Sequence, residues 1–204
     1  MNSRIFGDIS TKNKASVLTL LSIIIFSGSA FAASLTKSGP SGMIIDGTLS
    51  LATEPSKGFG DGLGFGVGFG MDVTDKTSIR SGRLMARGDI NYYKWDTSVF
   101  GVDVTLTRMP VFLGARYYAP VKAGSLVTMY AEGGLELSFD KSEAAACVGA
   151  LCVKEGASET NIGITPGAGV EFPLGHNLSL GANIRLHMIS DSYLSIGASI
   201  GHRF

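Results

Sequence analysis

One stretch of the sequence, residues 63–74, alternates strictly between two kinds of residue. Its six odd positions are all apolar, and its six even positions are all glycine or polar. Successive side chains of a β-strand point to opposite faces, so this stretch folded as a strand has one wholly apolar face. A helix, with 3.6 residues per turn, would mix the two sets. The stretch therefore predicts a strand.

The same alternation recurs along the chain from residue 43 onward. The segments that carry it are 43–51, 63–74, 80–92, 105–117, 127–140, 162–172, 178–188 and 194–204. Each is about ten residues long, which is the length that a tilted strand needs to cross a bilayer. After residue 32 no run of 18 apolar residues occurs, so no spanning helix is expected.

The connections between these segments differ in length in a regular way. The connections after the second, fourth and sixth segments are short and turn-like, at 75–76, 119–125 and 173–177, whereas longer loops are expected over 54–61, 94–103 and 141–159. Only the connection at 190–192 breaks the alternation of short and long. This arrangement is typical of an all-β, eight-stranded antiparallel up-and-down transmembrane β-barrel with its long loops at one end.

Composition helps to decide which face of the barrel is wet. The 17 basic and 17 acidic residues balance, which argues against a nucleic-acid partner. The non-apolar face is rich in glycine, which is a poor solubilising surface but lets strands close tightly around an interior. We therefore expect the apolar face to meet lipid. A soluble periplasmic ligand-binding barrel remains the alternative.

The start of the chain resembles a secretory signal. Basic residues precede the apolar run 15–26, and Ala30-Phe31-Ala32 has the small-x-small pattern of a cleavage site. The expected organisation is a signal peptide over 1–32, a short periplasmic segment over 33–42 and a barrel over 43–204. Export to an oxidising compartment favours a disulfide between Cys147 and Cys152, with free thiols or a metal site as alternatives.

Charged and polar side chains on the non-apolar face are expected to fill the lumen. Since both signs of charge occur, they can pair across it, and an eight-stranded interior is only wide enough for side chains. We favour this polar plug over a narrow, gated channel. The expected lumen residues are Arg83, Arg87, Asp89, Arg116, Tyr130, Glu132, Glu136, Glu171, Asn183, Arg185, His187 and Arg203.

The end of the chain carries the most specific pattern. Ile196, Ile200 and the terminal Phe204 share one face of the last segment, and residues 109–118 look like a fourth barrel strand. In these features the sequence resembles the Gram-negative outer-membrane beta-barrel domain family, including the small eight-stranded OmpA/OmpX-type barrels. The resemblance implies an outer-membrane location with both termini periplasmic, contact with outer-membrane lipids and lipopolysaccharide, and Phe204 as a signal for the barrel-assembly machinery.

For its activity, the resemblance implies a non-enzymatic structural, membrane-integrity or surface-interaction role through external loops. A lipid-modifying barrel enzyme is a further alternative, but Ser190 follows His187 at a spacing of three, where the lipid A deacylases have two, and so lies on the opposite strand face. No catalytic residues, cofactor or metal are expected. Interfacial aromatic girdles are expected from Tyr92, Tyr93, Trp95 and Phe139 at the outer rim, and from Tyr117, Phe172 and Phe204 at the inner rim.

Overall fold

The structure is a computed structural model of the chain, and it describes residues 42–53, 55, 59–79, 81–99, 102–120, 126–148, 151–175 and 177–204. The expected signal peptide, and the segment that follows it up to residue 41, lie outside these residues. Within the described ranges, no helix is both long and apolar enough to cross a membrane.

The described chain consists of strands and one short 3-10 helix, and each strand follows the alternation seen in the sequence. The elements are β1 (Met43–Ala52), β2 (Gly62–Asp72), η1 (Thr74–Lys76), β3 (Arg83–Val99), β4 (Val102–Tyr118), β5 (Thr128–Val148), β6 (Leu151–Ile164), β7 (Gly167–Pro173), β8 (Leu178–His187) and β9 (Tyr193–Arg203).

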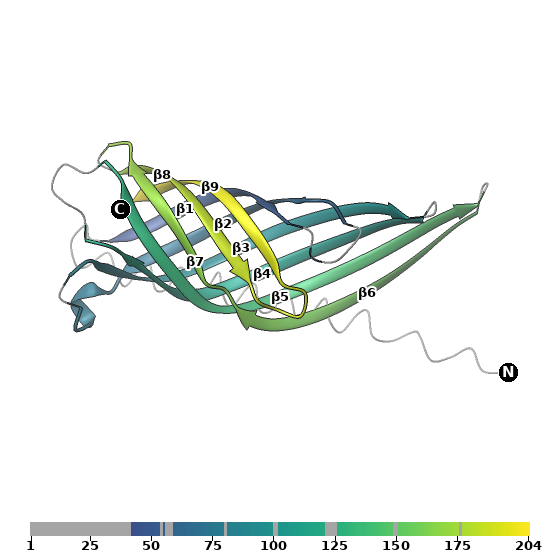
Figure 1. The fold of residues 1–204 in the computed structure, drawn as a ribbon, viewed down its shortest axis with the longest axis horizontal. Coiled ribbons are helices and arrows are strands. Elements are labelled where there is room, and N and C mark those ends of the chain that lie inside the picture. The colour runs from purple at the N-terminus through teal and green to yellow at the C-terminus, as the bar shows by residue number, and fades with distance from the viewer. Residues whose placement is uncertain are drawn as a thin grey trace. The chain divides into compact units, whose positions relative to one another are not determined.

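The strands close into a barrel because every stave pairs with two neighbours (Figure 1). β1 pairs with β2 on one side and with β9 on the other, and β4 pairs with β5. β5 pairs with β6 along residues 135–148 and with β7 along residues 128–132, so β6 and β7 share one stave. All pairings are antiparallel. The barrel has eight staves, which confirms the predicted fold class.

The strand predicted over 162–172 is interrupted by Thr165 and Pro166. Pro166 has no backbone N–H and cannot donate to a neighbouring strand. Instead, the Thr165 N–H donates to the Gly134 carbonyl at 3.0 Å, and the Leu186 N–H donates to the Pro166 carbonyl at 2.9 Å. The register with β5 is the same on both sides of the interruption, with Leu135 opposite Ile164 and Glu132 opposite Gly167, so β6 and β7 are two parts of one stave.

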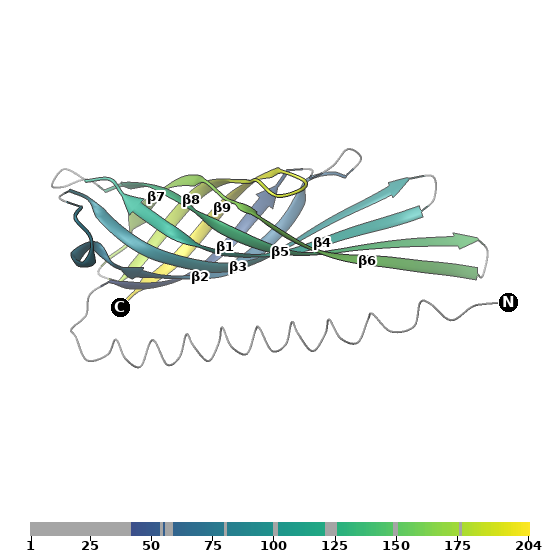
Figure 2. The same ribbon diagram turned by 90° about the horizontal axis from the view of Figure 1, so that it is seen from below.

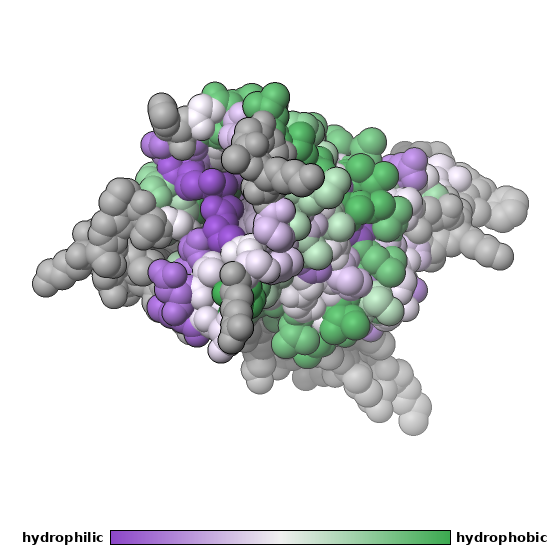
Figure 3. Space-filling view, turned by 60° about the vertical axis from the view of Figure 1, so that its left-hand side comes forward, coloured by the Kyte–Doolittle hydropathy of each residue, from purple (hydrophilic) through white to green (hydrophobic). Residues whose placement is uncertain are grey.

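The large apolar side chains of the barrel staves point away from the lumen. In β2, Leu63, Phe65, Val67 and Phe69 are all exposed, while the glycines between them are largely buried. The space-filling view shows apolar residues gathered over the barrel wall (Figure 3). A surface of this extent is typical of a wall in contact with lipid.

The glycines of β2 make room for the large inward side chains of β3. A Cβ added at Gly64 would lie 2.3 Å from the Tyr93 ring, and one added at Gly66 would lie 2.0 Å from Asn91 Oδ1. Gly62 stands against Trp95 in the same way, with 2.4 Å to Nε1. Because these glycines of β2 have no side chains, the large inward side chains of β3 pack directly against the β2 backbone.

Strands β3 to β6 continue beyond the barrel as a four-stranded sheet (Figures 1 and 2). We call this sheet the extension; it comprises residues 94–99, 102–107, 141–148 and 151–159. The two hairpins keep their pairing out to Val99↔Val102 and Val148↔Leu151, and β4 pairs with β5 as far as Val102↔Ala146. The prediction of long loops over 94–103 and 141–159 is therefore wrong, because most of these residues form strands.

The two ends of the barrel differ in what they carry. The terminal end carries the start of β1 and the end of β9, and the extension end carries the extension. The connections at the terminal end follow β2, β4 and β7, where the sequence predicted turns. The one after β2 is longer than predicted, because β2 ends at Asp72 and β3 begins only at Arg83, with η1 between them.

Candidate functional site

The candidate site is the lumen, whose middle layer is a network of buried ion pairs. Arg185 lies at its centre, with Nη2 2.8 Å from Asp89 Oδ2 and Nε 2.6 Å from Glu132 Oε1. The other carboxylate oxygen of Glu132 lies 2.8 Å from Arg116 Nη2. All four side chains are buried. They come from β3, β4, β5 and β8, so the network joins staves around the circumference.

A second pair extends this layer toward β1. Arg87 binds Asp46 with both terminal nitrogens, and the Nη2–Oδ1 distance is 2.7 Å. Arg87 Nε also lies 3.7 Å from Asp89 Oδ2, which links the pair to Arg185. Two-pronged arginine–carboxylate contacts of this kind fix orientation as well as charge.

Aromatic side chains fill the space between the arginines. The Arg116 guanidinium lies 3.9 Å from the centroid of the Tyr130 ring, and that of Arg185 lies 5.1 Å from the Phe112 ring. Both rings are buried. A cavity of about 10 Å³ remains between Asp46, Arg116 and Tyr130, which is room for about one water molecule.

The terminal end of the lumen is held by Glu171. It accepts hydrogen bonds from the Tyr118 hydroxyl at 2.7 Å and from Arg203 Nη2 at 2.8 Å. Arg83 lies with its guanidinium 4.3 Å from the Tyr118 ring centroid and 3.9 Å from Asp72. Arg83 and Arg203 are partly exposed here, unlike the arginines of the middle layer.

Toward the extension end, His187 joins a serine and a glutamate. Its Nδ1 lies 2.6 Å from Glu136 Oε2, and its Nε2 lies 2.8 Å from Ser195 Oγ. Thr165 donates a further hydrogen bond to Glu136. Serine, histidine and carboxylate thus follow one another in the order found in serine hydrolases. The partner of His187 is Ser195 rather than Ser190, the serine weighed in the sequence, because β9 turns back alongside β8.

A layer of aromatic rings covers this triad. Tyr193 stacks on His187 with a centroid distance of 4.1 Å and an interplanar angle of 2°. Tyr93 and Trp95 pack edge-on against Tyr193, and Trp95 Nε1 donates to the Thr53 carbonyl at 3.2 Å. The girdle positions expected for Tyr93 and Trp95 are therefore wrong: the strand parity points both rings into the lumen, where they are about 2% and 1% exposed.

Arg108 and Asp140 close the lumen beside the aromatic layer. Arg108 Nη2 lies 2.8 Å from Asp140 Oδ2, and Arg108 Nη1 donates to the Asp191 carbonyl at 3.1 Å. Arg108 is about 1% exposed. A substrate carbonyl could reach Ser195 Oγ only if this roof moved. Ser195 is itself about 1% exposed, so the triad is enclosed beneath this roof.

All the lumen residues expected from the sequence lie on the inward face of their strands, and Asn183 is half-buried there. The expectations missed Asp46, Arg108, Asp140 and Ser195, each of which takes part in a buried contact. Period two could have found them, because Arg108 has the parity of Arg116, and Ser195 that of Arg203. Among the described residues, no cluster of three His, Cys, Asp or Glu side chains could hold a metal ion.

The two cysteines lie in the extension. Cys147 of β5 stands directly opposite Cys152 of β6 in the backbone pairing. Their side chains are outside the described part of the structure, so the disulfide stays a prediction. Phe204 is exposed beside His202, with ring centroids 4.6 Å apart.

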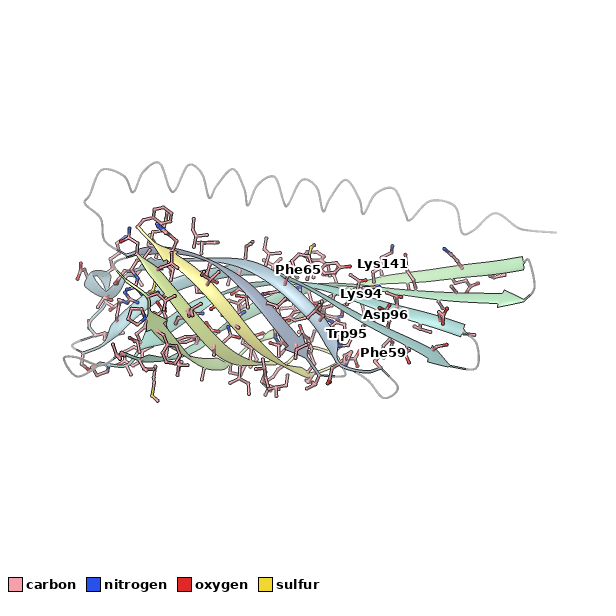
Figure 4. The ribbon with its side chains drawn as sticks, turned by 90° about the horizontal axis from the view of Figure 1, so that it is seen from above. Phe59, Phe65, Lys94, Trp95, Asp96 and Lys141 are labelled. Carbon is pink, nitrogen blue, oxygen red and sulfur yellow. The ribbon has the colours of Figure 1, made fainter. Side chains whose placement is uncertain are left out.

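Outside the barrel, three rows of side chains cross β3, β4 and β5 on the lipid-facing side. The first row begins with Phe65 of β2 and Tyr92 of β3, whose ring centroids are 5.3 Å apart, and includes Phe139 of β5, which lies opposite Met109 of β4. The register places the other two rows in the extension itself (Figure 4). They are Lys94, Thr107 and Lys141, and then Asp96, Thr105 and Glu143.

In the second row, Lys94 and Lys141 each form an ion pair with the carboxylate two residues further along the same strand. Lys94 Nζ lies 2.9 Å from Asp96 Oδ2, and Lys141 pairs with Glu143. Two hydrogen bonds lower the pKa of the Asp96 carboxyl, the larger contribution coming from Thr105 and the next from Lys94. The hydrogen bond between Lys94 and Asp96 also raises the pKa of Lys94. All of these groups are exposed.

Comparison with known proteins identifies the family. The model of the family described as outer membrane protein beta-barrel domain matches residues 18–204. The chain belongs to this family. Membership implies the outer membrane as its location. No curated protein matches the chain.

Several solved structures share the fold. Neisserial surface protein A is 20% identical, with a TM-score of 0.52, and the match covers 82% of this chain and 100% of that one. Ail, the attachment invasion locus protein of Yersinia pestis, in complex with the heparin analogue sucrose octasulfate, is 17% identical, with a TM-score of 0.52 and coverage of 82% and 99%. A major outer membrane protein from Thermus thermophilus is 14% identical, with a TM-score of 0.56 and coverage of 80% and 100%. At these identities the likeness concerns the fold alone.

Proposed function

We propose that this protein is a non-enzymatic surface-interaction protein, in which a filled barrel anchors the extension at the cell surface. The extension carries this proposal. Residues 153–160 of β6 are exposed on both faces of the strand, and a sheet that a packed core does not require is available for contact with other molecules. One of the related folds belongs to a protein whose name includes attachment, which is consistent with such a role.

The proposed orientation puts the extension outside the cell and both termini in the periplasm. Short turns at the terminal end and long hairpins at the other end support it, because outer-membrane barrels have short periplasmic turns and longer extracellular segments. A protease added to intact cells should then cleave the extension and spare the barrel. Cleavage only after the outer membrane has been opened would contradict the orientation.

The outer rows of side chains suit the headgroup region of the outer leaflet. Aromatic side chains favour the interface between hydrocarbon and headgroups, and the lysines of the next row lie where anionic phosphates of lipopolysaccharide would meet the protein. We include lipopolysaccharide among the proposed partners on this basis. Lys94→Ala combined with Lys141→Ala should weaken the retention of labelled lipid A by the purified protein, whereas Lys154→Ala, further out, should not.

The filled lumen argues against a function as a narrow channel. Ion pairs occupy its middle, and Tyr193, Trp95 and Arg108 close its extension end. We expect no steady conductance in planar bilayers. A reproducible conductance that changes with Arg185→Ala would restore the channel as the function.

The experiment that tests the proposal shortens the extension. In the shortened variant, residues 96–105 and 142–157 are each replaced by an Asn-Gly turn, which leaves the lumen residues in place. The shortened protein should still migrate differently with and without boiling, as a closed barrel does. Cells that carry it should lose adhesion to other cells or to surfaces. Unchanged adhesion together with a leakier outer membrane would instead favour a membrane-integrity role.

The enzyme alternative has its own test. Ser195→Ala should leave the acylation of lipopolysaccharide unchanged, because the roof over Ser195 excludes substrate. A change in the acylation pattern that Ser190→Ala does not reproduce would make Ser195 a nucleophile.

A further inference from the structure

The extension has one long edge that no described strand covers. β6 is the last strand of the sheet, and it pairs with β5 along residues 151–164 (Figure 1). On its other side the described chain provides only an isolated bridge from Ile164 to Met188. Residues 153–160 are all exposed, so this edge is open to solvent along the extension.

The bridge at Ile164 determines which residues of β6 face outward. Ile164 and Met188 exchange two backbone hydrogen bonds, of 3.2 and 2.9 Å, so Ile164 directs its N–H and C=O away from β5. The next residue, Thr165, donates to Gly134 of β5. Successive residues of an antiparallel strand alternate in this way, and the register with β5 is continuous from Ile164 to Leu151. The outward-facing residues along the open edge are therefore Lys154, Gly156, Ser158, Thr160 and Ile162.

This edge lacks the features that usually protect an edge strand, which are prolines, bulges and lysines. Between residues 151 and 164, β6 contains no proline, its pairing with β5 contains no bulge, and Lys154 is its only lysine. The side chains near the middle of the edge are small, being those of Gly156, Ala157 and Ser158. Another extended segment can therefore approach the backbone of β6 closely.

The charges beside the edge indicate which kind of segment fits. Odd-numbered side chains of β6 lie on the lumen side of the sheet, as Asn161 shows by donating to Asp140 at 3.2 Å. Glu155 and Glu159 share this face, four residues apart, and both are exposed. Among the described residues neither has an ion-pair partner, and Lys154 lies on the opposite face. A strand added beside β6 would thus meet two unpaired negative charges on one face.

A second copy of β6 does not supply the matching charges. In an antiparallel pair, outward-facing residues lie opposite outward-facing residues, so two β6 edges bring together residues of equal parity. Lys154 can then face neither Glu155 nor Glu159. In the register centred on Ala157 the two glutamates face each other, which destabilises a sheet. The edge therefore suits a partner of different sequence.

We infer that the β6 edge binds an extended, basic segment of another protein, which joins the extension as a further strand. The segment carries lysine or arginine at two positions four residues apart, opposite Glu155 and Glu159, because opposite charges across a strand pair stabilise it. Its backbone bonds to the even-numbered residues of β6 supply the remaining affinity. The inference rests on the proposed surface-interaction role and names the chemistry of the partner.

The probe that tests the inference is a dye-labelled synthetic peptide of about ten residues, a usual length for a strand. It alternates threonine and valine and carries two lysines four positions apart; a matched peptide has glutamates in their place. Binding to the full-length protein, without its signal segment, in nanodiscs of zwitterionic phospholipid is measured by fluorescence anisotropy. The lysine peptide should bind, and the glutamate peptide should not.

Hydrogen exchange measured by NMR separates strand addition from simple charge attraction. In the free protein the amides of Gly156, Ser158 and Thr160 face water, whereas those of Ala157 and Glu159 face β5. When nine-tenths of the protein is bound, exchange at the three even-numbered amides should slow about tenfold, because only the free fraction exchanges. Exchange at Ala157 and Glu159 should stay unchanged.

Variants test the charges and the backbone separately. Glu155→Lys combined with Glu159→Lys should weaken binding of the lysine peptide by about tenfold and allow the glutamate peptide to bind. Asp103→Lys combined with Glu143→Lys is the matched control, because it makes the same charge change on the other face of the sheet, and it should bind like the parent. Ser158→Pro removes one outward N–H without removing a bond to β5 and should also weaken binding. All variants should keep the heat-modifiable migration of a folded barrel.

The outcomes separate this inference from the proposed function. A lysine peptide that does not bind, or that binds without slowing the even-numbered amides, would overturn strand addition. Slow exchange of those amides without peptide would mean that a second copy covers the edge, and would also overturn it. If cells carrying Glu155→Lys and Glu159→Lys adhere like the parent while the shortened variant does not, the inference fails and the proposed function stands. Adhesion by the shortened variant itself would overturn the proposed function.

Discussion

The lumen and the extension use the same strands in opposite ways. In the lumen, β3, β4 and β5 direct arginines and carboxylates toward one another, and these side chains are almost completely buried. A few residues further along the same strands, Lys94 pairs with Asp96 in water, with about half of each side chain exposed. Ion pairs of nearly the same length, 2.8 Å in the lumen and 2.9 Å in the extension, therefore carry different energetic weight. Buried charges depend on their partners, whereas exposed charges are solvated without them.

The largest expected effect comes from breaking the buried network. Glu132→Ala should lower the free energy of unfolding by about 3–5 kcal/mol, because it leaves Arg116 and Arg185 without a shared carboxylate in a closed lumen. Urea titration of the protein in lipid vesicles measures it. Glu132→Gln should cost less, since the amide still accepts a hydrogen bond. Glu143→Ala in the extension is the matched exposed variant and should leave stability unchanged; equal losses at the two sites would erase the distinction between the regions.

A second comparison concerns two valines that are equally exposed in the isolated protein. Val67 on the barrel wall is 65% exposed and Val153 on β6 is 63% exposed. Val67→Arg should cost about 2–4 kcal/mol, because Val67 meets hydrocarbon near the middle of the bilayer. Val153→Arg should cost nothing measurable, because its surroundings are aqueous. Chemical denaturation in vesicles compares them, and similar stabilities of the two variants would contradict the membrane boundary.

A smaller effect is expected where the wall is thin. Gly66→Ala should destabilise the barrel by about 1–3 kcal/mol, since its Cβ would lie 2.0 Å from Asn91 Oδ1 and 2.8 Å from the Ile90 carbonyl. Gly133→Ala places a methyl group outside the barrel with nothing within 4 Å and should be neutral. The ratio of folded to unfolded bands on unboiled gels across a urea series would measure both variants. Equal stabilities of the two variants would mean that the lumen can accommodate an added methyl group at residue 66.

The smallest expected effect is a lowered pKa of the Asp96 carboxyl in the extension. Carbon-13 NMR titration of the Asp96 carboxyl should give a pKa below its ordinary value of 3.8. Thr105→Ala and Lys94→Ala should each raise that pKa, because each variant removes a hydrogen bond that stabilises the carboxylate.

The sign of the pH dependence follows from that lowered pKa. Any stabilisation from the contacts of Asp96 is present above the pKa of the unfolded chain and is lost as the pH falls through the lower pKa of the folded state. An Asp96 pKa at or above 3.8 would contradict the paired geometry.

The sequence predicted the barrel well because one physical constraint acts along its whole wall. Lipid on one side and a polar lumen on the other force alternation, as in β2, where Phe65 faces out and Gly66 faces in. The same parity could have placed Tyr93 and Trp95 inside, but their chemistry suggested an interfacial girdle instead. Parity was the better guide, because a strand cannot turn one side chain to the other face without a bulge.

The extension could not be predicted in the same way. Residues 154–161 of β6 are mainly polar in both parities, because water meets both faces of the strand and neither needs to be apolar. Period two is a signal of a one-sided environment, so it vanishes where the environment is the same on both sides. The extension is instead defined by its pairing with β5, which depends on the register already set inside the barrel.

The sequence by itself determined that the chain forms eight alternating staves and which side chains each stave turns toward lipid, since solvent acts on each residue separately. Tertiary structure decided which inward residues meet: that Ser195 rather than Ser190 binds His187, that Arg185 bridges Asp89 and Glu132, and that β6 ends the extension as an open edge. These contacts join residues from different strands, and closure of the barrel with one particular register is what brings them within bonding distance.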